Sequence, residues 1–144
     1  MIKSCSKIQG QFTSGANAFG QKAAAYALEA DLSPSFKMRD AFKKRSELVL
    51  GLLKNVPGIK LNYPKGAFYI FPDVSSFYGK STADGFKVNN SNDFCEYLLR
   101  RAFVGTVPGA AFGAPDCIRM SYASSDEKLI EAMNRIKDAC AQLS

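Results

Sequence analysis

The spacing of apolar residues changes along this sequence, and the change limits the folds that the chain can adopt. Up to about residue 56 the apolar residues recur at helical spacing. From residue 59 onward, short aromatic or alternating runs lie between glycine and proline residues, which is typical of strands and turns. Because 144 residues suffice for one ordinary domain, we expect an α/β fold, α+β-like, in which helices pack on a small sheet.

Two helices are predicted in the first part of the chain. Residues 17–30 are rich in alanine, and Asn17 can act as the N-cap. A long helix is predicted to begin at the N-cap Ser33, with Pro34 in its first turn, and to run to about Asn55. Its apolar face would consist of Phe42, Val49, Leu52, Leu53 and Val56.

About four strands are predicted in the second part. Residues 59–63 and 67–71 flank a short turn and are predicted to form a hairpin, and residues 104–107 and 117–122 add two more strands. Residues 73–92 are rich in glycine, serine and asparagine, which indicates a long surface loop.

Two further helices complete the prediction. Ser91 can cap a helix across residues 93–102, whose apolar stripe would be Phe94, Cys95, Leu98 and Leu99. Ser124 and Glu127 stand at capping-box spacing before a last helix. The apolar face of this last helix would be Leu129, Met133, Ile136 and Cys140.

The composition excludes several classes of protein. The chain is 47% hydrophobic and 22% charged, as in globular domains, and its apolar runs are too short for a membrane helix. The N-terminus lacks a secretory pattern, so we expect a cytoplasmic location. The formal charge of +6 is scattered, which indicates solvated helix faces and no nucleic-acid partner.

The cysteine and histidine content limits the chemistry. The four cysteines form no C-x-x-C pair, so reduced thiols are expected and no metal site. The chain has no histidine, which excludes a Ser-His or Cys-His catalytic arrangement. Any chemistry must therefore use other side chains or a cofactor.

Four short segments carry a family resemblance. They are Gln-Gly-Gln-Phe-Thr-Ser at 9–14, with Gln21 a little beyond, Gly-Ala-Phe-Tyr at 66–69, Val-Pro-Gly-Ala-Ala-Phe-Gly at 107–113, and Ile-Arg-Met-Ser-Tyr-Ala at 118–123. In this order they resemble the C-terminal portion of the class I aminotransferases, which are pyridoxal-phosphate enzymes of fold-type I. The resemblance is closest to bacterial aspartate aminotransferases.

The resemblance gives Arg119 a role. In the family, the arginine of the matching segment binds the α-carboxylate of the substrate. A guanidinium suits this role because its parallel N–H donors bind a carboxylate bidentately. The alternative is an arginine on a strand that pairs with a surface carboxylate.

The other matching segments have less defined roles. The loop near the active-site mouth would contain Pro108, Gly109, Phe112 and Gly113, although a plain turn between strands is the alternative. Residues 66–69 are expected to place aromatic side chains in the core of the sheet. Thr13 and Ser14 either approach the cofactor phosphate or cap a helix.

The resemblance also implies what lies elsewhere. The lysine that holds pyridoxal phosphate in this family belongs to an upstream segment with no match here, so no catalytic residue and no bound cofactor are expected in this chain. Residues 1–31 would be the tail of the large cofactor-binding domain, and residues 32–144 the small domain. The parent would be a homodimer that transfers an amino group from L-aspartate to a 2-oxoacid such as 2-oxoglutarate.

Other functions remain open at this point. The parent could act on alanine or aromatic amino acids, or could be a related lyase. The chain could also be a free-standing, non-catalytic binding or regulatory domain. In either case we expect apolar surface to be exposed on the alanine-rich helix at residues 17–30.

Overall fold

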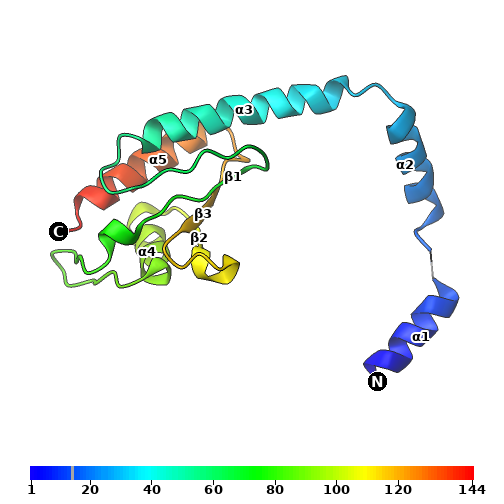
Figure 1. Ribbon diagram of the computed structural model, residues 1–144, viewed down its shortest axis with the longest axis horizontal. Coiled ribbons are helices and arrows are strands. Elements are labelled where there is room, and N and C mark those ends of the chain that lie inside the picture. Colours follow the sequence, from blue (N-terminus) through cyan, green and yellow to red (C-terminus); the bar gives the residue numbers. More distant parts are fainter. Residues whose placement is uncertain (14) are drawn as a thin grey trace. The chain divides into compact units, whose positions relative to one another are not determined.

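The structure, a computed structural model, describes residues 1–13 and 15–144. It divides into two compact units, Met1–Lys37 and Met38–Ser144. Figure 1 shows the helices and strands of both units along the chain. None of the helices in the described residues is long and apolar enough to cross a membrane.

The first unit contains helices α1 (Ile2–Phe12) and α2 (Ala18–Glu29). The predicted cap of α2 is confirmed, because the Asn17 side chain accepts a hydrogen bond of 2.7 Å from the Gly20 N–H. Neither helix contains a buried residue. The expected exposure of α2 is also confirmed, since its large apolar side chains Phe19, Tyr26 and Leu28 are exposed.

Helix α3 (Ser33–Leu53) is the predicted long helix. Ser33 lies inside the helix, and the Asp31 carboxylate accepts hydrogen bonds from its N–H, at 3.1 Å, and from its hydroxyl. The capping side chain is therefore Asp31 and not Ser33. The buried residues at the end of α3 are Val49, Leu50 and Leu53, while Leu52 is half-buried.

The sheet has three strands in the described residues, one fewer than predicted. Strands β1 (Tyr69–Ile70) and β2 (Val107–Pro108) both pair antiparallel with β3 (Ile118–Ser121), so the order is β1-β3-β2. Of the strand predicted at 104–107, only Val107 belongs to β2, which extends to Pro108.

The hairpin predicted between residues 59–63 and 67–71 is wrong. Residues 59–63 contribute a single bridge, from Lys60 to Asp73. Farther along, the Asn62 side-chain oxygen accepts a hydrogen bond from the Phe71 N–H at 3.2 Å. Because a side chain occupies this backbone donor, a regular ladder does not continue there.

The predicted surface loop at 73–92 contributes to the core. It contains the short 3-10 helix η1 (Ser75–Phe77), and its residues Val74, Phe77 and Val88 are buried. The Phe77 ring stacks on Phe94 with centroids 5.0 Å apart. The loop is therefore a packed part of the second unit.

Two helices cover the core from the later part of the chain. Helix α4 (Ser91–Tyr97) continues into the π-helix η2 (Leu98–Ala102), and α5 (Asp126–Ala141) follows β3. The predicted core face of α5 is confirmed, since Leu129, Met133, Ile136 and Cys140 are all buried. On the predicted stripe of the earlier helix, Leu99 is exposed and the buried Tyr97 takes its place, donating a hydrogen bond of 2.7 Å to the Ala139 carbonyl.

Both predicted N-caps of these helices are wrong by one residue. Asn90 caps α4, because its side-chain oxygen accepts hydrogen bonds from the Asn92 and Asp93 N–H groups, whereas Ser91 is buried in the first turn. Ser125 and not Ser124 caps α5.

Replacing Asn90 by alanine is expected to lower the free energy of unfolding by about 1 kcal/mol, because two amide donors of the first turn lose their acceptor. Urea unfolding followed by circular dichroism measures this change. Asn92→Ala is the matched control, since that exposed side chain accepts neither bond. Equal losses in the two variants would contradict the assignment of the cap.

Candidate functional site

Arg119 lies in the middle strand of the sheet. Its neighbours Ile118 and Met120 are buried, while Arg119 itself is half-buried, as the alternation of a strand requires. In the register of β3 with β2, Arg119 pairs with Val107. The guanidinium is thus carried by a strand with a neighbour on each side.

Two aromatic rings contact the Arg119 guanidinium. Its Cζ lies 4.6 Å from the centroid of the Tyr69 ring and 4.7 Å from that of Phe112. Tyr69 belongs to β1, and Phe112 belongs to the short helix η3 (Gly109–Phe112) that follows β2. Both distances are within the range of cation–π attraction.

Arg119 is distinguished from the other arginines by its partners. Of the six arginines, five form an ion pair with an aspartate or glutamate: Arg39, Arg45, Arg100, Arg101 and Arg135. Within residues 1–13 and 15–144, Arg119 has no such partner. Arg119 therefore does not form the surface ion pair that was the alternative. Its N–H donors are available to an added carboxylate.

The loop predicted at the active-site mouth holds Phe112 beside Arg119. Gly109 donates its N–H to the Cys117 carbonyl at 2.7 Å, which ties the start of the loop to the residue before β3. Gly113 ends η3 with a φ of +75°, a conformation that favours glycine. Pro108 and Gly113 shape the loop, while Phe112 is the loop residue whose ring contacts the guanidinium.

Residues 66–69 do not form the core cluster that was expected. Phe68 is 39% exposed, and Tyr69 is half-buried with its ring near Arg119. Ala67 has a φ of +62°, which is uncommon for a residue with a side chain. The Tyr122 hydroxyl donates a hydrogen bond of 3.0 Å to the Ala67 carbonyl, and the Tyr122 N–H donates to Phe68.

The hydrogen bond between Tyr122 and Ala67 joins two of the segments noted in the sequence, 66–69 and 118–123. Sequence reasoning did not identify this pair, since nothing in the local pattern indicates a left-handed alanine. By fixing the segment that carries Tyr69, the bond helps to place the ring beside Arg119.

Tyr122→Phe is expected to lower the free energy of unfolding by about 1 kcal/mol, the net value of one ordinary hydrogen bond. Thermal and urea unfolding of the whole chain measure it. Tyr26→Phe, at an exposed tyrosine of α2, is the matched control and should change stability little. A Tyr122→Phe variant as stable as the wild type would show that the bond does not hold Ala67.

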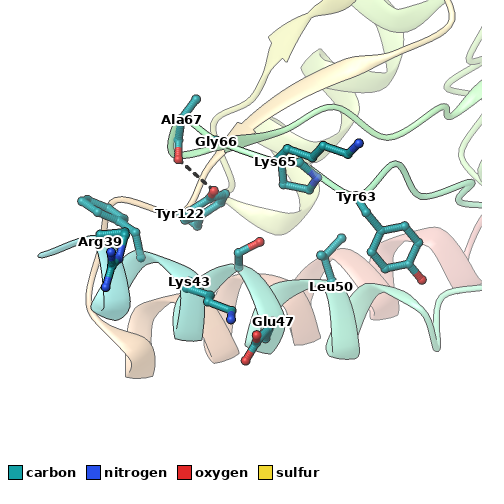
Figure 2. Close-up of a pocket in the computed structure, with 12 residues that line it drawn as sticks. Arg39, Lys43, Glu47, Leu50, Tyr63, Lys65, Gly66, Ala67 and Tyr122 are labelled. Atoms are coloured by element: carbon teal, nitrogen blue, oxygen red, sulfur yellow. Dashed lines mark hydrogen bonds between the residues drawn. The ribbon is translucent and has the colours of Figure 1, made fainter. Parts of the chain in front are cut away.

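Tyr122 also lines a groove of about 530 Å³ (Figure 2). Side chains of α3, including Phe42 and Leu50, form one wall, and residues 63–67 form the other. Arg119 does not line this groove. The centroid of the Phe42 ring lies 6.2 Å from that of Tyr122 and 6.0 Å from that of Phe68. Phe68 precedes Tyr69, whose ring contacts Arg119.

The residues predicted near the cofactor phosphate lie in the first unit. Thr13 is the C-cap of α1, and its hydroxyl donates to the Gln9 carbonyl at 3.2 Å. Its side chain thus has the helix-end role that was the alternative. Ser14 lies outside the described residues.

Comparison with known proteins identifies the family. A family model described as aminotransferase class I and II matches residues 1–136, nearly the whole chain. The chain belongs to the class I and II aminotransferase family. The α/β fold with its small sheet agrees with the solved structures of this family that it resembles.

Curated relatives of this aminotransferase chain are similar over all or nearly all of its length. An aspartate aminotransferase of Rhizobium meliloti (strain 1021) is 38% identical over 144 residues, which cover 100% of this chain and 35% of the relative. A bifunctional aspartate aminotransferase and glutamate/aspartate-prephenate aminotransferase of Petunia hybrida is 45% identical over 96% of this chain and 29% of its own length. The chain therefore spans about a third of the length of these relatives.

Solved structures of aminotransferases also match this chain over nearly all of its length. The aspartate aminotransferase from Rhizobium meliloti matches with a TM-score of 0.89 and 38% identity, covering 99% of this chain and 36% of that one. An aromatic aminotransferase from Pyrococcus horikoshii matches with a TM-score of 0.77 and 37% identity, covering 92% of this chain and 34% of that one.

Proposed function

We propose that this chain is the C-terminal portion of an aspartate aminotransferase. In this proposal residues 1–31 are the tail of the large cofactor-binding domain and residues 32–144 are the small domain. The longer protein transfers the amino group of L-aspartate to a 2-oxoacid such as 2-oxoglutarate. The names of the relatives and the length of chain that they share with this one support the proposal.

The observation that carries the site assignment is the unpaired state of Arg119. A half-buried guanidinium that has aromatic contacts and no carboxylate among the described residues offers its N–H donors to an anion. The planar fork of the guanidinium matches a carboxylate bidentately. Arg119 therefore binds the α-carboxylate of the amino acid and fixes its orientation.

The cofactor of the longer protein is pyridoxal phosphate, which stabilises the negative charge that develops when the Cα–H bond of the substrate breaks. In this proposal none of the lysines of this chain holds the cofactor; their side chains are exposed, apart from the half-exposed Lys80. The catalytic lysine is accordingly assigned to a part of the protein outside this sequence.

Within the longer protein, Arg119 acts by positioning. A substrate whose carboxylate is fixed has fewer orientations available, which lowers the entropic cost of reaction. We expect the longer protein to act as a homodimer in the cytoplasm.

A chimera tests this proposal. The matched third of the Rhizobium meliloti enzyme is replaced by this chain, and the oxaloacetate formed from L-aspartate and 2-oxoglutarate is measured with malate dehydrogenase and NADH. We expect amino transfer that the Rhizobium meliloti protein truncated before this region does not support. A folded chimera that binds pyridoxal phosphate and transfers no amino group from any amino acid would refute the proposal.

A second specificity is tested with the intact protein and not with the chimera. The aromatic aminotransferase of Pyrococcus horikoshii is nearly as identical in sequence to this chain as the aspartate enzyme of Rhizobium meliloti is, 37% against 38%, with a lower TM-score of 0.77 against 0.89. Purification of the protein from its own source, followed by comparison of kcat/KM for aspartate, tyrosine and alanine, shows which amino acid it prefers.

A further inference from the structure

The two rings beside Arg119 come from opposite sides of its strand. Tyr69 lies on β1 and Phe112 follows β2, and these strands flank β3 in the order β1-β3-β2. The distances from the Arg119 Cζ to the two ring centroids are nearly equal, 4.6 and 4.7 Å. This placement suits two rings that cover the two faces of one guanidinium.

Covering both faces would restrict how an anion can approach. A guanidinium stacks on aromatic rings through its flat faces, while its N–H donors point outward in its plane. An anion above or below the plane would have to displace a ring. A carboxylate in the plane can accept two parallel hydrogen bonds without disturbing either ring.

We propose that Tyr69 and Phe112 are positioning residues that clamp the Arg119 guanidinium between them and leave only in-plane approach to a carboxylate. This inference rests on the proposed function of Arg119 and extends it to two further residues. It assigns the aromatic side chains of the segments 66–69 and 107–113 a role in selecting a planar, bidentate anion.

Each ring is itself held by other contacts. Phe112 lies edge-on to Phe71 with centroids 6.0 Å apart, and Tyr69 lies 4.4 Å from Phe68. The backbone of Tyr69 is fixed in register with Ser121. Because other residues hold each of the two rings, the rings keep the guanidinium in place before an anion binds.

The clamp is tested by NMR of the whole chain labelled with ¹⁵N. The Arg119 side-chain Nε–H signal is identified as the one lost in Arg119→Lys. Rings over a guanidinium shift this signal away from the position shared by exposed arginines. We expect Phe112→Leu and Tyr69→Leu to return it toward that position, and the ring-retaining Phe112→Tyr and Tyr69→Phe to preserve the shift.

The effect on binding is tested with acetate as the probe. Sodium acetate replaces sodium chloride at constant ionic strength, and the Nε–H signal is followed. Loss of one cation–π contact is expected to weaken acetate binding about 2- to 5-fold in Phe112→Leu. Phe112→Tyr keeps an aromatic ring at this position and is expected to keep most of the affinity for acetate.

The outcomes separate this inference from the function on which it rests. If neither leucine variant moves the Nε–H signal, or if Phe112→Leu binds acetate as tightly as the wild type, the clamp is refuted. If the shifted Nε–H signal is present in the wild type but acetate does not move it, the carboxylate role of Arg119 fails and the clamp stands. Circular dichroism of each variant verifies folding, and Tyr69→Leu decides the matter if Phe112→Leu does not fold.

Discussion

Gly109→Ala is expected to destabilise the second unit by about 3 kcal/mol or more, the range of severe overpacking. A Cβ at this position would lie 2.2 Å from the Ala114 carbonyl oxygen and 2.4 Å from the Cys117 carbonyl oxygen. Both atoms belong to the backbone and cannot swing aside as a flexible side chain would. The loop would have to move away from β3, and Phe112 would move with it.

Urea unfolding followed by circular dichroism measures this loss, since the chain has no tryptophan to report on it. Gly105→Ala is the matched control, because a Cβ there meets no atom within 4 Å. A change within about 0.5 kcal/mol is expected for the control. A Gly109→Ala variant as stable as Gly105→Ala would show that the loop does not pack as described.

Arg119→Lys is expected to lower kcat/KM for aspartate about 10- to 100-fold in the chimera, because a charge-assisted bidentate contact is worth roughly 1.5–3 kcal/mol. Lysine keeps the positive charge, but its ammonium cannot donate two parallel hydrogen bonds from a planar fork. Its compact charge also loses the flat contact with the rings of Tyr69 and Phe112.

Steady-state kinetics with aspartate as the varied substrate measures the effect. Arg135→Lys is the matched control, since Arg135 lies exposed on α5 and pairs with Glu131. It should leave kcat/KM within about twofold, as a surface ion pair contributes little. If Arg119→Lys and Arg135→Lys had the same kcat/KM for aspartate, Arg119 would not be a substrate-binding residue.

The helices were the most predictable part of the fold, whereas of the predicted caps only Asn17 of α2 was right. The periodic apolar residues of α3 and α5 indicate a buried face, and most of them are buried. At the helix starts, adjacent residues such as Asn90 and Ser91 can both act as caps. The burial of Ser91 decides between them, and burial depends on distant parts of the chain.

The strands were harder to predict because tertiary contacts determine them. Residues 67–71 were expected to pair with their nearest neighbours along the chain, yet β1 pairs with β3. Asn62 contributes its side chain in place of a backbone partner, a choice that alternation of apolar residues does not indicate.

The candidate site could be named in part from the sequence. The family segments indicated Arg119 and Phe112, and the structure places the two side chains in contact. The contact with Tyr69 and the hydrogen bond from Tyr122 to Ala67 depend on how β1 and β3 pair, so no local pattern indicates them. The assignment of a carboxylate to Arg119 remains a prediction.

The location of the core also bears on how such a site can change during evolution. Among residues 1–13 and 15–144, every buried apolar side chain lies between Val49 and Leu143, and Tyr69, Phe112 and Arg119 lie in the same stretch. A substitution near these three residues can therefore be compensated by further substitutions in the same continuous segment of the chain, because the core that must repack lies in that segment. The contacts of Arg119 can therefore change by local mutation or by exchange of that stretch between related genes.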